Sequence, residues 1–480
     1  NLSNFYFLVF LMSVGFYFVF KNFKDLFKYK IYYFNLLILF ISSFNIGISK
    51  DANLYHLQQQ SWLRDEKIVF GLSNINPFLG YSSVMEYVYS VFWINGNYII
   101  IHFIGLYIVA SVFELIFKLL FSNSDKDNNI AYIFIIIGIL DNFGLGGGRN
   151  GFLFLQETFK YDHIFSALIC FSIILFFHNL TNKNENTFIV IFYILIFASQ
   201  VRFAGHLFLF FFILSTSILK IKLKKLGPAF LFYILFSIKN IFISSCLWFP
   251  VSFTCLNNLP WSQSGQAKYI SKLIINTNRF PNAKASDNIG FEQFLNAFIV
   301  SESSYLINFI ITLLILIFIF SIFGNKFNVT FLQFALLILI LSMWLYLAPK
   351  YRFGVPFFLL GYFVILKKYI SLVTFPALNN YLKFSLYLLV IIFTLRLDSI
   401  TALSSPQNIY INISQEEIDF VKTENGWYQY SKEHTVRNYL CGSVKYCYIK
   451  EYESDKKTTL LNYYYFQPKN KSYFSDLLLK

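Results

Sequence analysis

Long apolar runs recur along the chain, and they constrain its fold more than any other feature. A helix that crosses a bilayer needs about 20 predominantly apolar residues. About twelve runs approach that length, near residues 4–20, 31–48, 97–120, 130–143, 163–179, 187–200, 204–219, 228–247, 304–323, 328–348, 353–366 and 384–400. Only 13% of the residues are charged, against roughly 25% in a soluble domain. The sequence therefore excludes a water-soluble enzyme and predicts an all-α polytopic membrane bundle of about twelve transmembrane helices.

Lysine clusters between the runs orient this bundle. They follow the first, seventh and eleventh runs and consist of Lys21, Lys24, Lys28 and Lys30, then Lys220, Lys222, Lys224 and Lys225, then Lys367, Lys368 and Lys383. Positive charge in short loops marks the cytoplasmic side of a membrane protein. With twelve spans all three clusters fall on one side. The net charge of +14 therefore indicates topology, and we expect no nucleic-acid partner.

The same orientation places both chain ends and the larger loops outside. Residues 1–400 are expected to form the bundle, with outer loops at 49–96 and 248–303. In residues 401–480, charged residues, Asn and Tyr alternate with isolated apolar residues. We expect this tail to form a small extracytoplasmic segment with an α/β or β-rich fold.

The cysteines bear on metal binding and on the cellular compartment. The five cysteines fit no zinc pattern, because a zinc site needs about four N or S ligands at characteristic spacings. Cys441 and Cys447 lie close together in the tail, as Cys246 and Cys255 do in the second outer loop. Each pair can form a disulfide in an exported compartment, and unpaired thiols are the alternative.

A group of polar residues opens the first outer loop. Asp51 directly follows the second apolar run, and Tyr55 and His56 come one helical turn later. If a helix starts at Asp51, the i, i+4 spacing puts Asp51 and Tyr55 on one face, with His56 beside them. A carboxylate there has the chemistry to accept a proton from a sugar hydroxyl or to hold a divalent metal ion, and the sequence specifies no other cofactor. The alternative is that Asp51 only caps the helix.

Three cations lie at other outer helix mouths. Arg202 is in the tight turn SQVRFAG (199–205), and Lys350 and Arg352 are in LAPKYRFG (347–354). An arginine offers a bidentate fork to a phosphate group. These residues are therefore candidates for binding a lipid phosphate, with snorkelling to the membrane interface as the alternative.

Other polar residues inside or between the runs are less informative about chemistry. Lys239 lies within the eighth run and should have a partner there, such as an acidic group or a lipid phosphate. Glu114 and Lys118 have the i, i+4 spacing of a salt pair on one helix. The segment GLGGGRNG (144–151) lacks the ending of a phosphate-binding loop and is interpreted as a flexible outer hairpin.

Several of these segments resemble the GT-C glycosyltransferase superfamily of bacterial polytopic membrane proteins. In the first outer loop, Asp51-x-x-x-Tyr55-His56 is followed by a Gln-x-x-x-Trp stretch and by GLSNINPFLGYSS. The segments SIKNIFISSCLWFP (237–250) and APKYRFG (348–354) are similar to two further motifs of that superfamily. The resemblance extends over about residues 49–360, but only these patches are specific. The chain departs from the group at 245–248, where the group often has Gly and Pro.

The resemblance implies a GT-C-like bundle in which the loop acid, here Asp51, is the candidate catalytic base. It also implies a polyprenyl-phosphate sugar as the donor. The second acidic motif of the superfamily is carried over to Asp162, with His163 beside it, in ETFKYDHIF (157–165). The alternative is an interfacial Asp–His pair without a chemical role.

These observations together predict an integral membrane glycosyltransferase whose active site faces the extracytoplasmic side of a bacterial inner membrane. Asp51 and Asp162 are the predicted catalytic residues. The predicted substrate-binding residues are Tyr55, His56, His163, Arg202, Lys350 and Arg352. The expected partners are a polyprenyl-phosphate-linked sugar, membrane lipids, and a lipid, glycan or protein acceptor. The alternatives are a surface-polysaccharide polymerase, a translocator of lipid-linked sugars, and a structural or receptor-type protein in which these residues would not converge.

Overall fold

The structure of the protein is a computed structural model that describes most of the bundle and short parts of the tail. The described residues are 30–49, 51–66, 68–92, 99–140, 155, 157–159, 161–182, 184–218, 223–280, 284–285, 287, 289–301, 303–322, 331–347, 350–370, 378–401, 420–422, 428–430, 447–448, 454–458 and 464–468, with isolated positions before residue 30. Most of the first expected span, the glycine-rich segment 144–151 and Cys441 lie outside the described residues.

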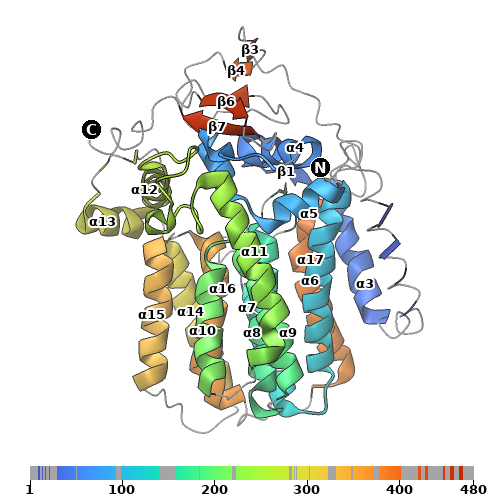
Figure 1. Cartoon of the computed structure of the whole chain (residues 1–480). Helices are drawn as coiled ribbons and strands as arrows, with labels where there is room; N and C mark the ends of the chain where they lie inside the picture. Colours follow the sequence, from blue (N-terminus) through green and yellow to red (C-terminus); the bar gives the residue numbers. More distant parts are fainter. Residues whose placement is uncertain are drawn as a thin grey trace.

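The protein is mainly helical, and the helices of its bundle stand side by side (Figure 1). They are α3 (Lys30–Leu39), α6 (Ile99–Leu120), α7 (Asp125–Leu140), α8 (Asp162–Asn182), α9 (Glu185–Val201), α10 (Gly205–Ile218), α11 (Gly227–Ser244), α14 (Ser303–Ile322), α15 (Phe331–Leu347), α16 (Tyr351–Ile370) and α17 (Asn380–Thr401). Four further helices lie at one end of the bundle, here called the loop end: α4 (Leu57–Asp65), α5 (Val84–Phe92), α12 (Gln266–Arg279) and α13 (Phe291–Ser301).

Some of these helices have the length and composition of membrane spans. In the described part of the chain, Ile100–Leu120, Asp162–Leu180 and Gly227–Ser244 are long and apolar enough to cross a bilayer. Shorter apolar helices accompany them at Glu185–Val201, Gly205–Leu214, Phe309–Ile319, Gln333–Leu345, Phe353–Lys367 and Asn380–Leu395. These helices indicate a membrane protein, but the expected count of about twelve spans is not shown.

The second expected span, 31–48, is not one continuous α-helix. Helix α3 ends at Leu39, a 3-10 turn covers Phe40–Asn45, and strand β1 covers Gly47–Ile48. The Ser42 hydroxyl donates a hydrogen bond of 2.7 Å to the carbonyl oxygen of Leu39. Short polar side chains of this kind compete with the helical hydrogen-bond pattern, which explains a break that the apolar run did not indicate.

Aromatic packing and internal hydrogen bonds hold the bundle together. The Phe113 ring of α6 packs edge-on against Phe134 of α7 and Tyr387 of α17, with ring centroids 6.3 and 6.2 Å apart. The Tyr387 hydroxyl donates to Asn35 Oδ1 of α3 at 2.6 Å. Polar groups at membrane depth need such internal partners because lipid chains offer none, so this bond ties two distant helices.

Lysines gather at the end of the bundle opposite the loop end. Lys225, just before α11, pairs with Glu185 at the start of α9 at 2.8 Å. Lys383 of α17 donates to the carbonyl oxygen of Leu120, where α6 ends. The expected salt pair of Lys118 with Glu114 on α6 is confirmed at 2.8 Å. We call this end the lysine end.

The tail contributes short strands, and one of them packs on the first outer loop. The strands are β3 (Phe420–Lys422), β4 (Tyr428–Tyr430), β5 (Cys447–Tyr448), β6 (Ser454–Thr458) and β7 (Tyr464–Pro468), of which β6 and β7 pair antiparallel. Phe466 of β7 is fully buried against Trp62, and its carbonyl oxygen accepts a 2.7 Å hydrogen bond from Asn74 Nδ2. Asn74 Nδ2 also donates to the Trp261 carbonyl oxygen at 2.8 Å, so this side chain joins the tail to both long loops, 49–96 and 248–303.

Two helix-starting glycines provide a test of how tightly the bundle packs. A Cβ at Gly205, the first residue of α10, would lie 2.6 Å from backbone atoms of Ser199 in α9, whereas nothing lies within 4 Å of a Cβ at Gly227. We expect Gly205→Ala to lower the free energy of unfolding by about 3 kcal/mol, because backbone cannot move aside like a flexible side chain. Gly227→Ala should be neutral within about 0.5 kcal/mol. Unfolding of both variants in the same detergent checks this, and equal stability would contradict the α9–α10 packing.

Candidate functional site

A short parallel strand pair organises the loop end. Strand β1 pairs with β2 (Glu157–Thr158), with Gly47 opposite Glu157 and Ile48 opposite Thr158. The backbone N–H of Ser49 continues the ladder by donating to the Thr158 carbonyl oxygen at 3.1 Å. Asp51 follows β1 and Asp162 follows β2, each as the first residue of a helical segment. Because parallel strands run in the same direction, the pairing brings both helix starts to one edge.

Asp51 begins a helix, as its spacing to Tyr55 and His56 predicted. The first turn, Ala52–His56, is π-helical and continues into α4. Asp51 makes no side-chain capping hydrogen bond; instead, the Ser49 hydroxyl accepts a 3.3 Å bond from the Asp51 backbone N–H. Asp51 thus occupies the N-cap position of this turn, but its carboxylate does not cap the backbone. Single π-turns inside α-helices are frequent at functional sites.

Arg202 connects the two acidic helix starts. It follows the last residue of α9, and its Nη2 lies 2.5 Å from Asp162 Oδ1. Burial alone would lower the pKa of the Arg202 guanidinium, but the negative charges of Asp162 and Asp51 favour its charged form, so the pKa is raised. The Arg202 side chain is still 30% exposed, whereas that of Asp162 is 8% exposed. Part of the Arg202 side chain therefore remains exposed beside the pair.

Two tyrosines complete this group, and one of them was not predicted. Burial and then the charge of Asp51 raise the pKa of Tyr55 well above its usual value. Burial also raises the pKa of Tyr81, although the charge of Arg202 opposes the shift. The Tyr81 hydroxyl is buried and finds no hydrogen-bond partner among the residues that the structure describes. Both phenols therefore stay protonated at neutral pH and can act as hydrogen-bond donors.

A buried carboxylate, Glu86 of α5, holds His56 in place beside the site. The sequence did not predict this residue. Glu86 is 1% exposed and pairs through Oε1 with Nδ1 of His56. Its Oε2 accepts a 2.9 Å hydrogen bond from Gln60 Nε2 of α4. The His56 ring lies between Tyr55 and Tyr161, with ring centroids 4.0 and 4.5 Å away. Glu86 thus fixes the orientation of His56. The sequence feature that could have predicted this role is the single acid in the apolar segment VMEYVYSVF (84–92).

Lys239 of α11 has a different partner from those expected. Its Nζ donates to both the carbonyl and the hydroxyl oxygen of Ser82, each at 2.7 Å. The neighbouring Ser83 hydroxyl donates to the carbonyl oxygen of Val201 at 3.0 Å. These bonds fasten the segment after Tyr81 between α11 and the end of α9. Lys239 therefore positions the loop and does not bind an acid or a lipid phosphate through this contact.

The remaining predicted site residues take separate places. His163 faces α6, since its Nε2 lies 2.7 Å from where a Cβ on Gly105 would be. The Lys350 carbonyl oxygen accepts the backbone N–H of Phe353 and of Gly354 at the start of α16. The Arg352 side chain lies outside the described residues. The Phe353 ring, however, lies 5.3 Å from the Arg202 guanidinium, so the start of α16 borders the site. Asp51, Tyr55, Asp162 and Arg202 are thus brought together.

A divalent metal ion fits these residues poorly. Across the described ranges, no three His, Cys, Asp or Glu side chains are grouped so that they could hold a metal ion. Asp162, the second acid of the site, is already paired with a guanidinium.

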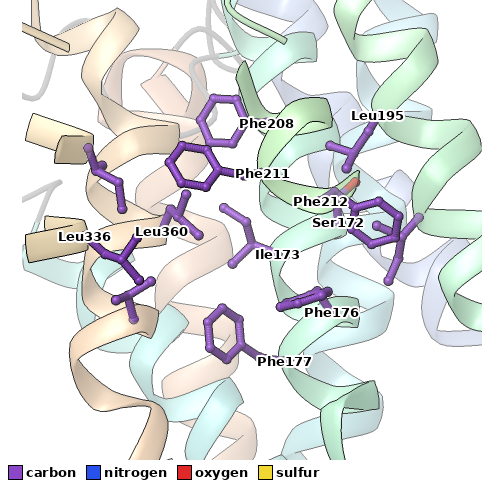
Figure 2. A pocket seen from close by; sticks show the side chains of 13 residues that line it. Ser172, Ile173, Phe176, Phe177, Leu195, Phe208, Phe211, Phe212, Leu336 and Leu360 are labelled. Carbon is purple, nitrogen blue, oxygen red and sulfur yellow. The ribbon is translucent and has the colours of Figure 1, made fainter. Parts of the chain in front are cut away.

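An apolar cavity lies between α8, α9, α10, α15 and α16 (Figure 2). Its volume is about 140 Å³. It is lined by Ser172, Ile173, Phe176, Phe177, Ile191, Leu195, Phe208, Phe211, Phe212, Leu336, Ile340, Leu360 and Val364. Leu360 lies seven residues after Phe353 on α16, or about 10 Å along the helix. Helix α16 therefore both borders Arg202 through Phe353 and lines the cavity through Leu360 and Val364.

Comparisons with known proteins give one family. A family model described as a domain of unknown function (DUF8201) matches residues 4–359, which is more than half of the chain. No curated protein and no solved structure matches the chain.

The Glu86–His56 pair makes a testable contribution to stability. Glu86→Ala should lower the free energy of unfolding by about 3–5 kcal/mol, because it leaves His56 and Gln60 buried without their partner. Glu86→Gln keeps an oxygen acceptor at the same place and should cost less than half as much. Thermal unfolding in detergent, with Glu185→Ala at the partly exposed Lys225–Glu185 pair as the control, checks the order. Equal losses in the Glu86→Ala and Glu185→Ala variants would contradict the network.

Proposed function

We propose that this chain, which belongs to the DUF8201 family of domains of unknown function, is an integral membrane glycosyltransferase. It would move a sugar from a polyprenyl-phosphate donor to a lipid, glycan or protein acceptor on the extracytoplasmic side of a bacterial inner membrane. The observation that carries the proposal is the convergence of Asp51, Asp162 and Arg202 at one end of an apolar bundle. Such a group combines a carboxylate for the acceptor with a cation for the phosphate.

The placement of the site supports reaction at the outer membrane surface. Helix α9 has 17 residues and is about 26 Å long, so Arg202 at its end lies near the boundary of a hydrocarbon core that is about 30 Å thick. The lysine end would face the cytoplasm. The loop end, at the opposite end of a bundle of about twelve spans, would then face the extracytoplasmic side. The disulfide between Cys246 and Cys255 at the loop end agrees with an oxidising compartment.

The reaction would be a single displacement. Asp51 would take the proton of the acceptor hydroxyl while the acceptor oxygen forms a bond to the anomeric carbon of the sugar. The bond from that carbon to the phosphate oxygen breaks, and the phosphate leaves with its electron pair. Arg202 would stabilise the charge that develops on the leaving phosphate, and Asp162 would keep the guanidinium in place. The protonated Tyr55 would donate a hydrogen bond to a substrate oxygen. One displacement inverts the anomeric configuration.

The cavity supports a lipid-linked donor over a translocation pathway. A translocator needs polar groups near the middle of the membrane, where its substrate crosses. The cavity is instead lined by apolar side chains together with Ser172 (Figure 2). An isoprenoid chain fits such a lining, with its phosphate toward Arg202. A polysaccharide polymerase would use the same donor chemistry, and the formation of products with several added repeats would distinguish it.

The central test is transfer by the purified full chain from candidate polyprenyl-phosphate sugars, followed by analysis of the lipid, glycan or protein product. We expect Asp51→Asn to slow transfer by about 10²- to 10⁴-fold, because the acceptor loses its base. Arg202→Gln should slow it by about 10²- to 10³-fold, because charge on the leaving phosphate is no longer neutralised. Glu114→Gln, at the lysine end of α6, is the control and should keep the parent rate. Full transfer by Asp51→Asn would refute the proposal.

The lipid chain gives a separate test. Leu360→Trp should fill much of the cavity and raise the KM for a long-chain polyprenyl donor, while a donor analogue with a short chain should be affected less. Leu235→Trp is the matched control, because Leu235 is 59% exposed on the membrane face of α11. Steady-state kinetics with both donors measures the difference. If the two variants behave alike with the long-chain donor, the chain does not occupy this cavity.

A further inference from the structure

A disulfide closes a small apolar loop at the outer end of α11. Cys246 and Cys255 are joined, and the loop between them has the sequence LWFPVSFT. The chain carries no Asp, Glu, Lys, Arg or His from Asn240 to Ala267. At the tip of the loop, Phe253 is 84% exposed, and Leu256 next to the disulfide is also exposed. The loop thus exposes two large apolar side chains on a segment without charge.

The loop is held in one conformation. The Thr254 hydroxyl donates to the carbonyl oxygen of Val251 at 2.7 Å and accepts the backbone N–H of Trp248 at 3.1 Å. Outside the loop, the Leu256 N–H donates to the Ser245 carbonyl oxygen at 2.8 Å. Together with the disulfide, these bonds present Phe253 in a fixed position. An ordered loop loses less conformational freedom when its tip binds a surface.

The position of the loop matches the surface of a bilayer. Helix α11 has 18 residues, which gives a length of about 27 Å and nearly spans a hydrocarbon core of about 30 Å. Lys225 precedes its other end. Its exposed apolar side chains, including Leu231, Leu235 and Ile238, form a face that lipid chains would cover. The loop directly follows α11. A helix of this length that spans the bilayer brings the next segment to the level where lipid headgroups meet the acyl chains.

The base of the loop contacts the candidate site. Phe249 is buried, and its ring lies 5.6 Å from the ring of Tyr81. A Cβ on Gly80 would lie 2.8 Å from the same Phe249 ring. The loop therefore touches the segment that carries Tyr81 at its base and exposes Phe253 at its tip.

We propose that the loop Cys246–Cys255 is a membrane-docking surface that inserts Phe253 into the interface of the outer leaflet. The occupant is a lipid surface, because the loop is uncharged, continues from the membrane face of α11 and lies at interfacial depth. A second copy of the chain is the competing occupant. The proposal stands whether or not the protein transfers sugars.

The test places a photo-crosslinking phenylalanine analogue at single positions of the full chain, reconstituted in vesicles of phosphatidylethanolamine and phosphatidylglycerol. Position 253 is the test site. Leu235, on the membrane face of α11, is the control for contact with lipid, and the exposed Asp65 of α4 is the control for a loop in water. After illumination, mass spectrometry of the intact protein measures phospholipid adducts. We expect the adduct yield at 253 to be within about threefold of that at 235 and at least about tenfold above that at 65.

Other outcomes would overturn the proposal. A covalent dimer as the main product at 253 would assign the loop to contact between copies of the chain. A yield at 253 as low as at 65, with normal lipid adducts at 235, would place the tip in water. The analogue at position 253 replaces a side chain that is almost fully exposed, so the fold of the protein is kept in every arm.

Discussion

The pairing of Asp162 with Arg202 is the interaction on which the loop end depends. Arg202 follows α9 and Asp162 begins α8, so their 2.5 Å contact joins two helices where they meet the outer loops. A charge at the edge of a membrane is costly unless it is paired. The pair satisfies this requirement and leaves part of the Arg202 side chain exposed. In the proposed function, the same interaction would hold the cation that meets the donor phosphate.

The surroundings of this pair explain why Asp51 belongs to the same group. The two-residue ladder between β1 and β2 fixes both aspartates at one edge, and the π-turn after Asp51 brings Tyr55 toward Arg202. Behind them, Glu86 orients His56, and Lys239 fastens the loop through Ser82. The exposed groups are thus supported by buried ones, which is the arrangement that a site needs to hold its geometry when a substrate binds.

The sequence predicted the charged members of the site but not the contacts that bring them together. Asp51 and Arg202 were visible because charges beside long apolar runs are rare. Strands of two residues, such as β1, carry no detectable periodicity. Tyr81 was hidden among 34 tyrosines. The partner of Lys239 includes a backbone carbonyl, which every residue possesses, so no sequence pattern marks it. Hydropathy located most of the bundle helices. It did not predict the break after Leu39, where the Ser42 hydroxyl donates a hydrogen bond to the Leu39 carbonyl oxygen.

The contact between Phe249 and Tyr81 links the disulfide loop to the loop that carries the candidate site. Phe249 of the docking loop contacts the ring of Tyr81. The charge of Arg202 also acts on Tyr81, because it opposes the rise that burial causes in the pKa of this phenol. A loop fixed at the lipid surface would therefore hold Tyr81 at a constant height above the bilayer. A substrate whose chain lies in the membrane presents its polar head at a height set by that same surface. If the same membrane surface sets the height of the site and of the ligand head group, the ligand approaches the site in fewer relative orientations, and less entropy is lost on binding.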